Sequence, residues 1–263
     1  MRKYIAIFKF ELMNSIQYVF NSFSRVAMHV LQIFIFTSLW SYIYSDPSNV
    51  INGYSYNQMI WYIIFGNTLR MITAGRTLTE DISEEVINGG IATKLTKPYN
   101  FINYQLASTA GKSITKFFIF TIVGLVFGYI FVGSFPELTV WSVIIVLISS
   151  IIAAILDNLM SIIIGLFSFV IEDSSPIYWV YSKFLMIFGQ TFPIEFFPGI
   201  IGTIMYLSPI LAIKYGPAKL FVDFSWKAAL IILIIQVFYL IVIYLLAQLI
   251  YKKGVKKLNV NGG

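Results

Sequence analysis

Long apolar runs separated by shorter polar stretches dominate the chain, and they predict membrane-spanning helices. About 20 mostly apolar residues in a helix are enough to cross the hydrocarbon core of a bilayer. We predict six transmembrane helices, at residues 26–44, 57–73, 113–132, 138–170, 177–192 and 227–250. The fold class is therefore an all-α integral membrane protein, with one transmembrane domain over residues 1–263.

The fourth run, residues 138–170, is too long for a simple crossing. At 1.5 Å per residue it would reach about 50 Å, against a core of roughly 30 Å. We expect it to tilt, protrude or break, with Asp157 and Asn158 as the point of irregularity.

Residues 1–22 have a different pattern, with apolar residues on one helical stripe and charged residues beside it. The stripe consists of Ile5, Phe8, Leu12, Ile16 and Val19. Such a helix is typical of the membrane interface, where it lies along the surface. A soluble helix packed against a partner is the alternative.

Residues 193–217 are apolar but rich in proline and glycine, which argues against one unbroken span. Two short re-entrant helices fit this composition if protein shields the ends of their backbones. We therefore predict an outer re-entrant hairpin between the fifth and sixth spans.

Composition supports a membrane protein, because 58% of the residues are hydrophobic and only 11% are charged. Soluble domains are usually about 45–50% apolar and about 25% charged. The chain has no cysteine and one histidine, so we expect neither disulfides nor a metal site. Its heavy use of Ile, Asn and Lys suggests an AT-rich bacterial genome.

Basic residues set the expected orientation, because they concentrate on the cytoplasmic side of membrane proteins. We expect the chain to lie in a bacterial plasma membrane with both termini in the cytoplasm. The outer side of the membrane then holds mainly three basic residues, Lys214, Lys219 and Lys227. The cytoplasmic set is much larger: Arg2, Lys3, Lys9, Arg25, Arg76, Lys94, Lys97, Lys112, Lys252, Lys253, Lys256 and Lys257. The segment 76–100 is then cytoplasmic.

Segment 76–100 reads as a short amphipathic helix that stops near Asn88 and Gly89. Thr77 with Glu80, and Asp81 with Glu84, have the spacing of capping boxes. Such an element suits docking to a soluble partner, and an ordinary solvated loop that caps itself is equally consistent with the pattern.

Two stretches resemble the ABC-2 type permeases, the membrane subunits of ATP-binding-cassette exporters. Gly90-Ile91 followed by Leu95-x-Lys97-Pro98 is similar to the family's Gly-x-Leu-x-x-x-Leu-x-Arg-Pro segment. Pro193, Pro198 and the stretch from Pro209 to Ala218 are similar to its outer hairpin before the last span. Lys97 departs from the usual arginine, which keeps the charge but loses the forked donors.

The resemblance implies a permease subunit that pairs with an identical or related permease and binds two copies of an ABC ATPase. ATP and Mg would be held by that partner, and this chain would bind no cofactor and no nucleic acid. Contacts with the ATPase would come from the coupling segment, at Glu80, Asp81, Ile82, Glu84, Glu85, Val86, Gly89, Gly90, Ile91, Leu95, Lys97 and Pro98. The outer hairpin would be anchored at Pro193, Pro198, Pro209, Tyr215 and Pro217.

One apparent nucleotide motif does not qualify. Ala110-Gly111-Lys112-Ser113 ends like a phosphate-binding loop, but that loop needs a glycine where Leu106 stands. It also needs a preceding strand, whereas this stretch leads into a span. We therefore expect no ATP-hydrolysing or other catalytic centre in this chain.

Polar residues within spans are costly and usually face protein or water. The candidates for a substrate path or gate are Arg25, His29, Asn67, Arg70, Asp157 and Asn158. The alternative is interhelical pairing that fixes packing, for instance Asp157 with Arg70 or Lys183. Arg25 in particular can extend to the lipid headgroups.

The sequence and the resemblance are consistent with three functions. An ATP-driven exporter of an amphipathic drug, peptide, lipid or glycan agrees best with the resemblance. A stand-alone secondary transporter or channel usually has inverted repeats, and the sequence has no visible internal repeat. A membrane enzyme acting on lipids needs clustered acids or a Ser/His/Asp set, whereas Asp157 and His29 are isolated in sequence.

Overall fold

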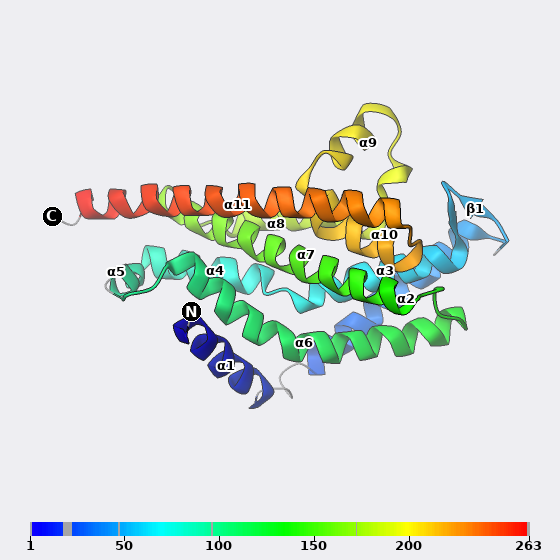
Figure 1. The fold of residues 1–263 in the computed structure, drawn as a ribbon, viewed down its shortest axis with the longest axis horizontal. Helices are drawn as coiled ribbons and strands as arrows, with labels where there is room; N and C mark the ends of the chain where they lie inside the picture. The colour runs from blue at the N-terminus through cyan, green and yellow to red at the C-terminus, as the bar shows by residue number, and fades with distance from the viewer. Residues whose placement is uncertain (1, 18–22, 47, 96, 172, 262–263) are drawn as a thin grey trace.

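The computed structural model describes residues 2–17, 23–46, 48–95, 97–171 and 173–261, and these form an elongated bundle of helices (Figure 1). The α-helices are α1 Arg2–Gln17, α2 Phe23–Tyr44, α3 Tyr56–Ile72, α4 Gly75–Ile87, α5 Gly90–Leu95, α6 Phe101–Val132, α7 Val140–Leu166, α8 Ser175–Leu185, α9 Gly199–Tyr206, α10 Gly216–Val222 and α11 Trp226–Asn261. Shorter elements are η2 Phe167–Phe169, η3 Met186–Thr191, η4 Ile194–Phe196 and η5 Leu211–Tyr215, of which η3 and η5 are π-helical. Strands β1 Val50–Ile51 and β2 Tyr54–Ser55 form a small antiparallel hairpin.

Four helices are long and apolar enough to cross a membrane, namely α2, α6, α7 with η2, and α11. A fifth crossing is counted if α9 and the continuous η5–α10 segment are taken as one bent span. The prediction of an all-α multi-pass membrane protein is therefore confirmed. The hairpin β1–β2 lies at the opposite end of the long axis from the C-terminus (Figure 1).

Helix α6 begins at Phe101, well before the start predicted for the third span at residue 113. The Asn100 side chain caps it by accepting from the Asn103 backbone N–H at 3.0 Å. The polar first turns face α1, where the Ser108 hydroxyl donates to Glu11 at 2.9 Å. The predicted start at residue 113 was too late because it counted apolar residues only, and the polar residues before it are helical and pack on another helix.

The close crossing of α1 and α6 explains the glycine of the apparent phosphate-binding sequence. A Cβ atom at Gly111 would come within 2.5 Å of the Phe8 carbonyl oxygen. Tyr4 also accepts a hydrogen bond from the Asn100 backbone at 3.0 Å. Residues 110–113 thus form a helix–helix contact inside α6.

The predicted apolar stripe of residues 1–22 is divided between two environments. Phe8 and Leu12 are half-buried, whereas Ile5 and Ile16 are exposed. Residues 18–22, and with them Val19, lie outside the described part of the chain.

Helix α7 runs unbroken through Asp157 and Asn158, so the irregularity expected there is absent. Both side chains are buried, and the backbone continues because each has a polar partner from a neighbouring element. Helix α7 continues directly into η2, which packs beside α4, so the long apolar run forms one extended helical segment.

Residues 193–217 fold into short pieces, as the prolines and glycines predict. Helix α9 and the η5–α10 segment meet at a bend of 69°. Helix α9 projects from one side of the bundle, while α10 lies beside α3 and α7 (Figure 1). The last helix, α11, continues to Asn261, beyond the predicted end at residue 250.

Candidate functional site

Helix α4 is fixed to the rest of the bundle by its apolar face. Ile82 is 0% exposed and Val86 is 6% exposed. A Cβ atom at Gly165 of α7 would approach Ile82 within 2.9 Å, so the two helices meet at that glycine. Thr79 donates to the Ser161 carbonyl at 3.0 Å, and the hydroxyls of Ser83 and Ser168 lie 2.6 Å apart. The apolar residues of the predicted coupling segment therefore bind the permease itself.

The opposite face of α4 is exposed and mostly acidic. Asp81 and Glu84 are exposed, and Glu80 accepts from Arg76 at 2.6 Å. Partial burial raises the pKa of Asp81 above its ordinary value; Lys112 opposes this shift, and the neighbouring glutamates add to it. A partner that meets this face meets negative charge.

The turn between α4 and α5 forms as the glycines predict. Asn88 is the C-cap, and Gly89 takes a φ of +69°, a conformation that glycine adopts without strain. Glu85 accepts a hydrogen bond from Lys94, which also lies over the ring of Tyr104 at 5.1 Å. This ion pair ties α5 back onto α4.

Both predicted capping boxes are wrong. Helix α4 begins at Gly75 with Ala74 as its N-cap, and no side chain caps it. Thr77 and Asp81 therefore lie inside the helix. The backbone N–H of Ala74 is satisfied instead by Asn158 Oδ1 of α7, at 3.3 Å. This long-range contact has no local sequence signature.

The remaining coupling residues take separate roles. Gly90 opens α5, and Ile91 is fully buried. The Pro98 carbonyl accepts a hydrogen bond from Lys3 of α1, and Lys97 is exposed. Leu95 ends α5, but its side chain lies outside the described part of the structure.

Asp157 forms a buried ion pair with Lys214, at 3.0 Å between Oδ2 and Nζ. Tyr181 donates to the other carboxylate oxygen at 2.8 Å. The predicted partners, Arg70 and Lys183, were wrong. Lys214, which was predicted among the outer charges, is 2% exposed and lies inside the bundle. Charge counting assigned Lys214 by position along the chain, whereas the π-helical segment η5 carries it into the bundle.

Arg70 is held by neutral oxygens. Its guanidinium donates to Asn67 Oδ1 at 3.0 Å and to Gln32 of α2. Gln190 of η3 also donates to Asn67, at 3.3 Å. These residues join α2, α3 and η3 in one polar network, which brings together Asn67 and Arg70 from the predicted set.

His29 is fully buried on α2 and forms no hydrogen bond to Asn67, Arg70 or Gln190. Its Nε2 atom lies 3.4 Å from the Thr68 hydroxyl, and its ring meets Phe120 edge-on at 5.4 Å between centroids. The structure places it in the packing between α2, α3 and α6.

A polar cavity of about 360 Å³ lies where α3 ends and α4 begins. It brings together the predicted residues Arg25, Arg70 and Asp157. It also includes Lys116, Gln190 and Lys214, which sequence reasoning had not selected. Lys116 is the one charged residue in the predicted span 113–132, and this pattern could have identified it as a candidate site residue.

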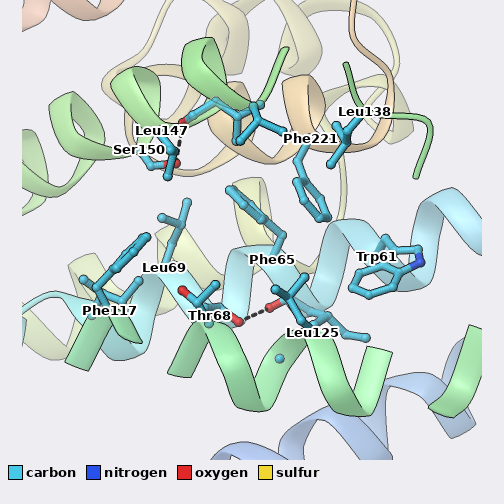
Figure 2. A pocket seen from close by; sticks show the side chains of 16 residues that line it. Trp61, Phe65, Thr68, Leu69, Phe117, Leu125, Leu138, Leu147, Ser150 and Phe221 are labelled. Carbon is cyan, nitrogen blue, oxygen red and sulfur yellow. Dashed lines mark hydrogen bonds between the residues drawn. The ribbon is translucent and has the colours of Figure 1, made fainter. Parts of the chain in front are cut away.

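A second cavity of about 240 Å³ is almost wholly apolar and lies between α3, α6 and α7 (Figure 2). Phe65 and Leu69 of α3 point into it, opposite Leu147 and Phe221 (Figure 2). Two of its hydroxyl groups are occupied, since Thr68 and Ser150 donate to carbonyls of their own helices. Such a cavity suits an apolar group without hydrogen-bonding needs.

Near the β hairpin, Glu195 organises a cluster that sequence reasoning missed. It accepts from Tyr54 at 3.1 Å and Tyr215 at 2.5 Å, and it lies 3.5 Å from Lys219. Of the predicted hairpin residues, Tyr215 is part of this cluster. Pro198 precedes α9 and Pro217 stands in the first turn of α10, where a missing N–H is tolerated. Pro193 precedes η4, and Pro209 lies between α9 and η5.

These features define a class: a multi-pass, mainly helical membrane protein with polar groups inside its bundle. The family model described as ABC-2 family transporter protein matches residues 26–262, nearly the whole chain. The chain belongs to that family, and it is an ABC transporter permease, a membrane subunit of a family without its own nucleotide-binding domain. The family implies an ABC ATPase as partner. Comparison with curated proteins finds no match.

Proposed function

We propose that this chain is the membrane subunit of an ATP-driven exporter, moving an amphipathic drug, peptide, lipid or glycan out of the cytoplasm or inner leaflet. The observation that carries this proposal is the α4–α5 elbow. Its apolar side packs on α7, where Ile82 meets Gly165, and Asp81 and Glu84 on its acidic side are exposed. A push on the elbow would therefore be transmitted directly to a membrane-spanning helix.

The proposed orientation has both termini in the cytoplasm of a bacterium, with six spans in the plasma membrane. Helix α3 and the α8–η3 segment would supply the second and fifth crossings, although each is shorter than the other spans. Residues 193–217 would form the re-entrant hairpin on the outer side. Because Lys214 is buried in the bundle, it is not counted among the basic residues of the outer side. The excess of basic residues on the cytoplasmic side is then larger.

The proposed assembly contains two copies of the ATPase and a second permease, identical or related. The ATPase would bind ATP and Mg and would contact the acidic face of α4 around Asp81 and Glu84. A basic groove on the ATPase is the complementary surface. Glu85 would act indirectly, because its carboxylate already binds Lys94.

A stand-alone secondary transporter or channel, the alternative function, usually has ionisable groups near mid-membrane, and Asp157 is the strongest candidate for such a group. Its pairing with Lys214 and Tyr181 favours a structural role. The exporter proposal therefore does not use Asp157 as a carrier.

The test is co-purification with the ATPase, followed by ATP hydrolysis in lipid nanodiscs. Glu84→Lys reverses an exposed charge on α4, and we expect it to abolish stimulation of the ATPase by the permease. Glu137→Lys is the matched control, since Glu137 is also exposed but lies in the connection between α6 and α7. Normal stimulation of the ATPase by Glu84→Lys would contradict the proposal.

A further inference from the structure

Three basic side chains from different helices meet at the polar cavity of about 360 Å³. Arg25 comes from the start of α2, Arg70 from the last turn of α3 and Lys116 from α6. Arg25 and Lys116 also line a neighbouring cavity of about 280 Å³ between α1, α4 and α6, where Lys112 and Asp81 are the other charged residues.

Other basic residues around this region have carboxylate partners. Lys214 binds Asp157, Arg76 binds Glu80, and Lys112 lies 3.9 Å from Glu11. Within the described residues, Arg25, Arg70 and Lys116 form no such ion pair. The cavity therefore carries an excess of three positive charges.

The surroundings of these cations orient them without neutralising them. Arg70 is bound by the amide oxygens of Asn67 and Gln32. The charged groups that act electrostatically on Lys116 are Arg25 and Lys112, and both are cations. Charges inside a membrane protein are costly unless they are paired, so the unpaired Arg70 and Lys116, with the exposed Arg25 beside them, indicate an anion supplied from outside the chain.

Hydrogen-bonding capacity also remains at the cavity. Gln190 lines it and is 2% exposed, and its Oε1 atom has no partner among the described residues. Asn67 Nδ2, in the same network, is also without a partner there. Asn67 does not line the cavity, so the Gln190 oxygen is the group that a hydroxyl donor of a ligand would satisfy.

We propose that this cavity binds the phosphate group of an anionic phospholipid, with Arg70 and Lys116 as its principal contacts and Arg25 at the entrance. Basic pockets between helices near the membrane surface suit such headgroups, and Arg70 keeps its Nη1 group for a charge-assisted hydrogen bond to a phosphate oxygen, since Nε and Nη2 donate to Asn67 and Gln32. Arg25 is exposed, and the exposed apolar residues Met28 and Ile35 follow it on the same face of α2. This face gives an acyl chain a path beside the bound headgroup.

The proposal rests on the membrane placement given above and not on the ATPase, so it is tested with the purified permease alone. Binding of fluorescent phosphatidylglycerol and phosphatidylcholine is measured in neutral detergent. We expect preference for phosphatidylglycerol and about tenfold weaker binding in Lys116→Gln, the effect of losing one charged hydrogen bond. Lys116→Arg should restore binding, and Lys252→Gln, at an exposed position on α11, should leave it unchanged.

Size-exclusion profiles and melting temperatures establish that each variant is folded. Equal binding of the two lipids, or wild-type affinity in folded Lys116→Gln, would overturn the proposal. Inorganic phosphate provides the final arm: we expect it to compete weakly, and displacement at concentrations similar to the lipid would overturn the assignment to a phospholipid. Failure of ATPase stimulation with intact lipid binding would affect only the exporter proposal.

Discussion

Individual charges within this bundle fall into two groups that differ in their partners. The Asp157–Lys214 pair is neutralised internally and almost fully buried. Arg70, by contrast, is bound by amide oxygens. An intact buried ion pair is tolerated in the folded protein. Removal of either partner destabilises the protein, because the remaining partner is then a buried charge without compensation.

We predict that Asp157→Asn and Lys214→Met each lower the stability of the permease by about 3–5 kcal/mol. The double variant Asp157→Asn/Lys214→Met should recover much of the loss, since no buried charge remains. Thermal unfolding in detergent measures this double-mutant cycle. Additive losses in the double variant would contradict the pairing, and Asp173→Asn, at an exposed position, serves as control.

Asp81 gives a pH-dependent prediction on the exposed face of α4. Its pKa is raised in the folded protein, chiefly by partial burial. The folded state then binds its proton more tightly than the unfolded state, so this carboxylate destabilises the protein as pH rises above its ordinary pKa. We expect Asp81→Asn to raise the melting temperature at pH 7 and to have a smaller effect at pH 4. An equal effect at both pH values would contradict this.

At the scale of elements, α4 packs one face against the rest of the permease and leaves the other face exposed. Its attachment depends on close packing at Gly165 and on hydroxyl contacts with α7 and η2. The Glu85–Lys94 pair then sets the direction of α5. Because these contacts are continuous, movement of the elbow and movement of α7 should be coupled.

Two isoleucines of α4 test that coupling. Ile82 is fully buried against α7, and Ile87 is 55% exposed on the same helix. We expect Ile82→Ala to cost about 2–5 kcal/mol of stability by leaving a cavity. It should also reduce stimulation of the ATPase, whereas Ile87→Ala should change stability by less than about 0.5 kcal/mol. Equal effects of the two variants would exclude a special role for the buried face.

The elements that sequence reasoning placed well are those with a strong local signal. The apolar runs located α2, α3 and α7 closely, and Gly89 marked the end of α4. The errors concern contacts between distant residues. No local pattern indicates that Lys214 turns inward to Asp157, that Asn158 satisfies Ala74, or that Glu195 gathers Tyr54 and Tyr215. The candidate cavity was therefore only half predictable.

For the whole molecule, the exporter proposal requires that the α4–α5 turn and the α6–α7 connection lie on opposite sides of the membrane. The chain contains no cysteine, so single cysteines can be introduced without a background signal. Asn88 is exposed in the first connection, and Glu137 is exposed in the second. Both positions are free of the helix packing described above.

We predict that a membrane-impermeant maleimide added to intact cells labels Glu137→Cys and leaves Asn88→Cys unlabelled. After the cells are opened, Asn88→Cys should react as well, because the elbow is then accessible from the cytoplasmic side. Ala212→Cys, at a fully buried position, controls for unfolding and should stay unlabelled in both conditions. Labelling of Asn88→Cys in intact cells would put the elbow outside, where no ATPase could reach it, and would contradict the exporter proposal as a whole.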